Sequence, residues 1–236
     1  MSDLLGAIGQ AWPRLLCYPG GVSAALAALL LARLRGVRLI DPPSANRLID
    51  LILPLGAISL LPLPLATTFP YSLDLPTALT LLIWPGLRRA ATERHSAHQL
   101  SVYLPLVLGG IALSSATATF DLGGLLRWPA EPTRQATLLL GAAAWIVAVP
   151  RIAPPSPDAA MVCSGLGLML IGTLPLIAAL NATPLADSAP AWLIAALAVC
   201  IATGALIGAG RLPEWAVQLL AGLALVSAGV AAVEMR

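Results

Sequence analysis

Two histidines offer the most direct acid–base chemistry in this sequence. His95 and His98 lie three positions apart, a spacing that places them on one side of a helix. Because an imidazole titrates near neutral pH, such a pair can take up and release a proton under physiological conditions. The alternative interpretation is that both side chains lie at a membrane interface or bind a neighbouring protein. Tyr103 follows on the same segment, but a phenol with a reference pKa of ~10 is a poor proton carrier at neutral pH.

Other residue types that carry chemistry are scarce or badly spaced. Cys17, Cys163 and Cys200 are far apart in sequence and have no paired spacing, so we interpret them as small apolar fillers and expect neither a metal site nor a disulfide. No Asp, Glu, Lys or Arg lies near the middle of any long apolar segment. Ion pumps and proton relays depend on such groups inside the membrane, so the sequence predicts no relay of its own.

The elements that must position these residues are membrane helices. The chain has 236 residues, of which 58% are hydrophobic and 10% charged, it has no lysine, and its mean hydropathy is +0.89. A soluble domain carries roughly 25% charged residues. The apolar runs are long and do not alternate, which favours helices over a barrel. We predict an all-α, polytopic integral membrane protein that forms a single domain over residues 1–236.

Eight apolar segments predict eight crossings. They are Leu15–Leu34, Leu48–Thr67, Leu75–Leu87, Leu100–Phe120, Ala136–Ile152, Met161–Asn181, Ala191–Gly210 and Trp215–Val233. The third is shorter than the ~20 residues of a straight crossing, so we expect it to be tilted or interrupted. Five prolines are expected inside crossings, namely Pro54, Pro62, Pro64, Pro105 and Pro175. Small residues in the spans predict close helix packing.

The arginines predict the orientation, because positively charged loops stay on the cytoplasmic side. The gaps on one side hold Arg33, Arg35, Arg38, Arg47, Arg88, Arg89, Arg94, Arg151 and Arg211. The opposite side has four arginines that are offset by acidic residues. We therefore expect a multi-pass protein of the inner membrane with both termini on the periplasmic side and no signal peptide. The spread of the arginines gives no reason to expect nucleic-acid binding.

The segment around the histidines resembles a known family. Residues 94–105 are similar to the Arg-Ala-Ala-Ala-Gln-x-Ile-Ser-Tyr-Glu-Leu-Pro segment of the quinone-site membrane subunit of respiratory complex I, the NADH–quinone oxidoreductase. The matching positions are Arg94, Ala97, Ser101, Leu104 and Pro105. His98 stands in place of the glutamine, Val102 of the tyrosine and Tyr103 of the glutamate. Asp121-Leu122-Gly123 resembles the Asn-Leu-Gly that follows this helix in the family.

A second stretch supports the resemblance. Residues 148–158, which include Arg151, three prolines after it and Asp158, lie where the family has an Ala-Glu-x-Asn-Arg-x-Pro-Phe-Asp-Leu-Pro loop that faces the cytoplasm. The segment from Arg211 to Gln218 is loosely compatible with the family's closing pattern. Eight spans with both ends outside also agree with the family's core.

The departures from the family concern its charge relay. Family glutamates in the fourth and fifth helices help to carry charge, and the corresponding positions here hold Tyr103 and Ala148 or Val149. The loop after the first span, which borders the quinone tunnel in the family, is reduced to residues 38–44. The resemblance thus implies that the fold is kept while the relay is lost or moved to neighbouring proteins, as in the membrane-bound hydrogenase-type relatives.

The resemblance implies a non-catalytic membrane subunit of a complex I-like oxidoreductase. Its cytoplasmic loops would dock peripheral iron–sulfur subunits, and its flanks would join antiporter-like, ion-translocating subunits and lipid. The chain itself would bind no cofactor, with iron–sulfur clusters in its partners and a quinone or a lipid at its cytoplasmic edge. The residues placed at that docking or quinone-proximal edge are Arg94, His95, His98, Tyr103, Arg151 and Asp158, with loop contacts from Arg33, Arg35, Arg38, Arg88 and Arg89. Two alternatives remain, a small permease for a neutral solute and a purely structural spacer.

Overall fold

The regular elements of the described chain are helices. The computed structural model describes residues 45–62, 73–93, 96–152, 159–183, 197–198, 200–202, 204–205 and 213–233. Its elements are α3 (Ala45–Ser59), α4 (Leu75–Glu93), α5 (Ser96–Thr117), the short 3-10 helix η2 (Leu122–Leu126), α6 (Pro132–Ile152), α7 (Ala159–Asn181) and α10 (Glu214–Val233). Within these residues the only β-type pairing is an isolated antiparallel bridge between Asp74 and Asp121. The predicted all-helical class is confirmed for this part of the chain.

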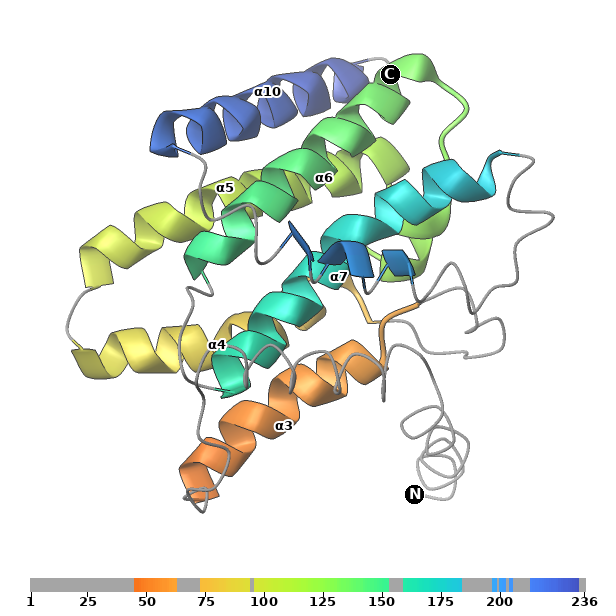
Figure 1. Cartoon of the computed structure of the whole chain (residues 1–236). Coiled ribbons are helices and arrows are strands. Elements are labelled where there is room, and N and C mark those ends of the chain that lie inside the picture. Colours follow the sequence, from red (N-terminus) through yellow and green to blue (C-terminus); the bar gives the residue numbers. More distant parts are fainter. Residues whose placement is uncertain are drawn as a thin grey trace.

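The long helices form two layers that meet at α6 and α7. Helices α5, α6 and α10 pack on one another in the first layer, and α3, α4 and α7 pack in the second (Figure 1). Within the second layer α7 contacts both α3 and α4, and it also contacts α6 and η2. Helix α7 is therefore the centre of the bundle, and nearly all of its side chains are buried.

Glycine and alanine allow the helices of the first layer to approach closely. A Cβ placed on Gly109 of α5 would lie 3.1 Å from both the carbonyl oxygen of Gly141 and the amide nitrogen of Trp145 in α6. A Cβ on Gly141 would lie 3.1 Å from the amide nitrogen of Leu113. Helix α10 adds a face of small buried residues, Ala221, Ala224, Ala228 and Ala231. Small residues are what membrane helices use to bring their backbones together.

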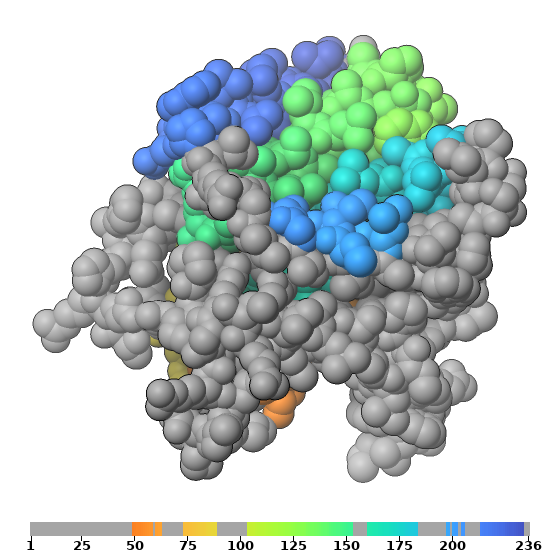
Figure 2. All heavy atoms as spheres, in the orientation of Figure 1, coloured from red at the N-terminus to blue at the C-terminus, as the bar shows by residue number. Residues whose placement is uncertain are grey.

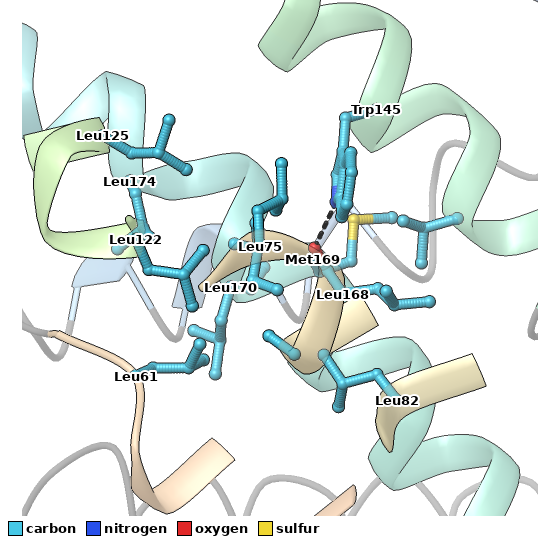
Figure 3. Close-up of a cluster of buried hydrophobic side chains, with 14 of the residues drawn as sticks. Leu61, Leu75, Leu82, Leu122, Leu125, Trp145, Leu168, Met169, Leu170 and Leu174 are labelled. Atoms are coloured by element: carbon cyan, nitrogen blue, oxygen red, sulfur yellow. Dashed lines mark hydrogen bonds between the residues drawn. The ribbon is translucent and has the colours of Figure 1, made fainter. Parts of the chain in front are cut away.

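Large side chains fill the space around α7. Leucines from α4, η2 and α7 interdigitate there, and Trp145 of α6 lies at the edge of the cluster (Figure 3). The indole nitrogen of Trp145 donates a hydrogen bond of 2.7 Å to the carbonyl oxygen of Leu168 in α7. A Cβ on Gly172 would lie 2.9 Å from Cδ1 of Trp145, so this glycine leaves the room that the indole occupies. Trp145 thus joins the two layers.

Two aspartates organise one end of the bundle. Asp74 caps α4, because its Oδ1 accepts a 2.8 Å hydrogen bond from the amide of Thr77. Asp121 caps η2 in the same way through the amide of Gly123. The backbone bonds Leu75 N to Phe120 O (2.7 Å) and Leu122 N to Leu73 O (3.2 Å) hold the two caps side by side.

Successive helices run in opposite directions between two ends of the bundle. We name them the Arg88 end, where Asp50 of α3 meets Arg88 of α4, and the Asp74 end, where Asp74 meets Asp121. Contacts such as Thr137 with Ser227 (3.1 Å) place the second half of α10 beside the start of α6. Each described long helix therefore has one terminus at each end, as expected for consecutive hairpins through a membrane (Figure 1).

Three of the described helices are long and apolar enough to cross a membrane. They are α6, α7 over Ala160–Asn181, and α10. The apolar parts of α3 and α5 in the described residues are shorter, Ile49–Ile58 and Tyr103–Thr117. The predicted crossing Leu15–Leu34 and most of Ala191–Gly210 lie outside the described residues. A membrane protein is thus supported, and the number eight stays a prediction.

Several boundaries differ from the predictions for local reasons. Helix α3 ends at Ser59, so Pro62 follows the helix instead of interrupting it, and Pro64 lies outside the described residues. Helix α4 continues past Leu87 to Glu93, because its charged residues are still good helix formers. Helix α6 begins at Pro132 instead of Ala136, since proline fits the first turn of a helix.

The outer surface of α10 is apolar. Its buried face carries alanines and Val217. Its large exposed hydrophobic side chains are Trp215, Leu219, Leu223, Leu225, Val226, Val230 and Val233. Figure 2 shows α10 and part of α6 at the surface on this side of the bundle. A helix that faces water has apolar residues on its buried face and polar residues on its outer face, whereas α10 has large apolar residues on its outer face. This pattern supports a hydrocarbon environment for the first layer.

Candidate functional site at the Arg88 end

An ion pair closes the contact between α3 and α4. Nη1 of Arg88 donates to Oδ1 of Asp50 at 3.0 Å, with side-chain exposures of 36% and 20%. Asp50 lies in the second turn of α3, and Arg88 lies in the second half of α4. Two opposite charges at the same end of an antiparallel helix pair form an ion pair near the edge of the apolar region. Part of the charge of Arg88 is therefore neutralised within the protein.

Tyr103 of α5 lies where α4, α5 and α7 meet, beside Gly86 of α4. Its half-buried ring packs against the core, and its hydroxyl oxygen would be 2.8 Å from a Cβ placed on Gly86. The terminal methyl of Met161, near the start of α7, would be 3.8 Å from the same point. Gly86 is thus the residue of α4 that gives the phenol its space. Tyr103 is also the position that carries glutamate in the resembled motif.

A buried hydroxyl of α7 also forms a hydrogen bond to α4. Oγ of Ser164 in α7 donates to the carbonyl oxygen of Leu82, one turn before Pro85. Proline has no amide hydrogen, so the carbonyl of Leu81 loses its helix partner and the helix is weakened at this turn. Ser164 is 1% exposed, so its hydrogen bond lies fully inside the bundle.

The structure brings together part of the predicted set. Arg88 and Tyr103 both lie at the Arg88 end, on either side of Gly86. Arg151 lies in the last turn of α6 and is partly buried at the same end. His98 belongs to the first turn of α5 and Arg89 to α4, but their side chains are not among those that the structure describes. The remaining predicted residues, Arg33, Arg35, Arg38, Arg94, His95 and Asp158, lie outside the described residues.

Sequence reasoning missed three contributors to this site. Asp50 stands at the start of an apolar segment, and its position near the same membrane edge as Arg88 was a signal for the ion pair. Gly86 follows a proline, which marks an irregular turn of the helix. Ser164 had no signal, because a serine in a membrane helix usually satisfies its own helix.

Helices α6 and α7 carry no charged residue near their centres. Helix α7 has no charged residue, and α6 carries its arginines, Arg134 and Arg151, near its two termini. Within the described residues no group of three His, Cys, Asp or Glu is placed to hold a metal ion. Of the cysteines in the described residues, Cys163 is buried and Cys200 is exposed, and the two do not form a disulfide. What the site offers is one guanidinium–carboxylate pair, one phenol and one arginine at a helix end.

Comparisons with known proteins add no assignment. No protein-family model, no curated protein and no solved structure matches this chain.

Proposed function

We propose that this chain is a membrane-embedded, non-catalytic subunit of a complex I-like oxidoreductase. In this role it docks the peripheral iron–sulfur arm at the Arg88 end and joins antiporter-like subunits through its flanks. The proposal rests on the similarity of residues 94–105 to the segment of the quinone-site membrane subunit of complex I, with Tyr103 in the place of the glutamate. It assigns the redox centres to other chains.

The junction at Tyr103 is the structural observation that supports the proposal. The phenol stands between Gly86 and Met161 in a packed helix contact, where the family has a residue that carries charge. A phenol in this packing serves as a structural contact. A chain with a phenol in place of the carboxylate is suited to hold partners together.

The arrangement of charges supports docking at the Arg88 end. Asp50, Arg88 and Arg151 lie at this end, whereas Asp74, Asp121 and Glu131 lie toward the opposite end together with Arg127 and Arg134. Following the positive-inside rule, we assign the Arg88 end to the cytoplasm, where a peripheral arm would bind. The proposed localisation is the inner membrane, with both termini on the periplasmic side.

The test is extraction of the tagged full chain from its native membrane in mild detergent, followed by identification of the proteins that accompany it. We expect iron–sulfur and antiporter-like subunits, and quinone reduction by the complex but no activity of the chain alone. Arg151→Gln should lower the recovery of the peripheral subunits severalfold. Arg127→Gln is the matched control, because Arg127 is exposed just after η2 and belongs to the opposite end. Recovery of the chain as a solitary, stable homo-oligomer would contradict the proposal.

The permease alternative predicts a different result. Purified protein in liposomes would then transport a neutral solute without any partner. Within the described residues, the buried polar side chains are Ser114, Thr137, Ser164 and Thr173, which lie on three different helices. Thr137, Ser164 and Thr173 donate to backbone carbonyl oxygens instead of lining a common path. This placement favours the subunit over the permease.

A further inference from the structure

Helix α4 changes character at Pro85. Before this residue the helix is anchored by a buried seam of Leu75, Ala78 and Leu82. Leu82 lies directly over Gly167 of α7, where any Cβ would clash with it. The amide of Leu75 is bonded to Phe120 at 2.7 Å, which fixes the start of the helix to the segment before η2.

The hydrogen-bond ladder of α4 is weakest in the turn that ends at Pro85. Pro85 donates no hydrogen bond to the carbonyl of Leu81, and the following Gly86 gives the backbone unusual freedom. The hydroxyl of Ser164 donates to the carbonyl of Leu82, so α7 holds the last firmly packed turn before the break. Sharp bends in helices occur at such proline and glycine positions.

Beyond the break, the two side chains that the structure describes, those of Leu87 and Arg88, lie outside the core. Leu87 is exposed, and Arg88 is partly exposed while it pairs with Asp50 of α3. Gly86 itself lies under the hydroxyl of Tyr103. Among the side chains that the structure describes beyond Pro85, the contact with α3 is thus the ion pair of Arg88.

We infer that α4 is hinged at Pro85–Gly86 and that residues 86–93 form an outer arm that the Asp50–Arg88 pair latches against α3. A partly exposed ion pair contributes little stability, so its loss shifts the arm between two positions without unfolding the bundle. The inference concerns the isolated protein and does not rest on the proposed function. A movable arm at the Arg88 end would change the shape of that surface.

The hinge is tested by distance measurements between spin labels on the full chain in nanodiscs. The three native cysteines are first replaced by alanine. One label is placed at Leu219→Cys, on the exposed face of α10, and the second at Leu87→Cys in the outer arm. A matched pair uses Leu219→Cys with Thr80→Cys, which lies on the exposed side of α4 before the hinge.

Asp50→Asn should raise the population of a displaced arm about two- to fivefold in the Leu87 pair and leave the Thr80 pair unchanged. Glu131→Gln breaks the ion pair with Arg134 near the opposite end and should change neither distance distribution. Adding Pro85→Ala to Asp50→Asn restores an amide donor to the ladder and should return the Leu87 pair to one narrow distance. An unchanged Leu87 pair in Asp50→Asn, or equal broadening of both pairs, would overturn the hinge.

Discussion

The α5–α6–α10 layer and the α3–α4–α7 layer bury different kinds of side chain at their helix contacts. In the first, Gly109, Gly141 and the alanines of α10 bring backbones together. In the second, leucines around α7 interdigitate, and Ser164 donates to a backbone carbonyl of α4. Trp145 of α6 donates to a carbonyl of α7 and so bonds one layer to the other. Lipid is as apolar as leucine, so burial alone does not hold membrane helices together. In the first layer the helices are held together by close contact between backbones. In the second they are held together by side chains of complementary shape and by hydrogen bonds.

The largest effect should come from the residue that joins the layers. Trp145→Ala removes a fully buried indole and its hydrogen bond to Leu168, and we expect the free energy of unfolding to fall by about 3 kcal/mol. The measurement is detergent-driven unfolding in bicelles. Trp84→Ala is the control, since Trp84 is 43% exposed, and should change stability by less than about 0.5 kcal/mol. Equal effects of the two substitutions would refute a role for Trp145 in joining the layers.

A single methyl group should distinguish close backbone packing from simple burial. Gly141→Ala forces a Cβ against the backbone of α5. A backbone cannot move aside as the end of a side chain can, so the free energy of unfolding should fall by about 1–3 kcal/mol. Gly222→Ala on α10 meets nothing within 4 Å and should stabilise the helix by about 0.5–1 kcal/mol. The two variants are compared in the same unfolding assay. If Gly141→Ala is stabilising too, the layer does not depend on close approach.

The backbone at the end of α5, in the α5–α6–α10 layer, is strained, and a glycine would relieve the strain. Ala118 follows α5 with a φ of 54°, and the amide of Thr119 bonds to the carbonyl of Ser114 at 3.2 Å, as in a glycine-type helix terminus. Ala118→Gly should therefore raise the unfolding free energy by about 1 kcal/mol. Ala136→Gly, at an exposed site inside α6, should lower it by a similar amount. A loss of stability in Ala118→Gly would contradict the assigned backbone conformation.

The smallest expected effect concerns the cap of α4 in the leucine-rich layer. The hydroxyl and amide of Thr77 both bond to Asp74 and hold the pKa of its carboxyl below the ordinary value of 3.8. Because the folded pKa lies below the unfolded one, the stabilisation is present above about pH 4 and is lost as the pH falls through the folded pKa. Asp74→Asn keeps a capping oxygen but does not titrate. The difference in stability between the two proteins should therefore shrink or reverse below about pH 4, and a constant difference would argue against the cap.

Continuous apolar runs made some helices predictable to the residue. The end of α7 at Asn181 and the end of α10 at Val233 agree with the sequence prediction, because no proline or charge interrupts the last turns of either helix. The start of α3 and the continuation of α4 to Glu93 contain polar residues. The helix propensities of these residues differ little from those of their neighbours, so they did not mark the helix boundaries. The five residues of η2 carry no periodic pattern, and the short helix depends on Asp121 and on the bridge to Asp74.

The candidate site could be predicted in outline but not in its contacts. The arginine pattern predicted that Arg88 and Arg151 share one side, and both lie at the same end of the bundle. The contact of Tyr103 with Gly86 depends on how α4 and α5 pack, which no single segment encodes. Ser164 is equally hidden, because its acceptor Leu82 is 82 positions away in the chain.

The most direct test of a membrane-spanning bundle is which side of the membrane each of its ends faces. Single cysteines at Ala130 and Glu214 are suitable, because both sites are exposed. Ala130 precedes α6 at the Asp74 end, and Glu214 begins α10 at the Arg88 end. Each variant carries no other cysteine in this chain. It is labelled with a membrane-impermeant thiol reagent in intact spheroplasts and in inverted vesicles. We predict that Ala130→Cys reacts from the periplasmic side and Glu214→Cys from the cytoplasmic side. Reaction of both from the same side, or release of the protein from membranes by alkaline carbonate, would contradict this topology.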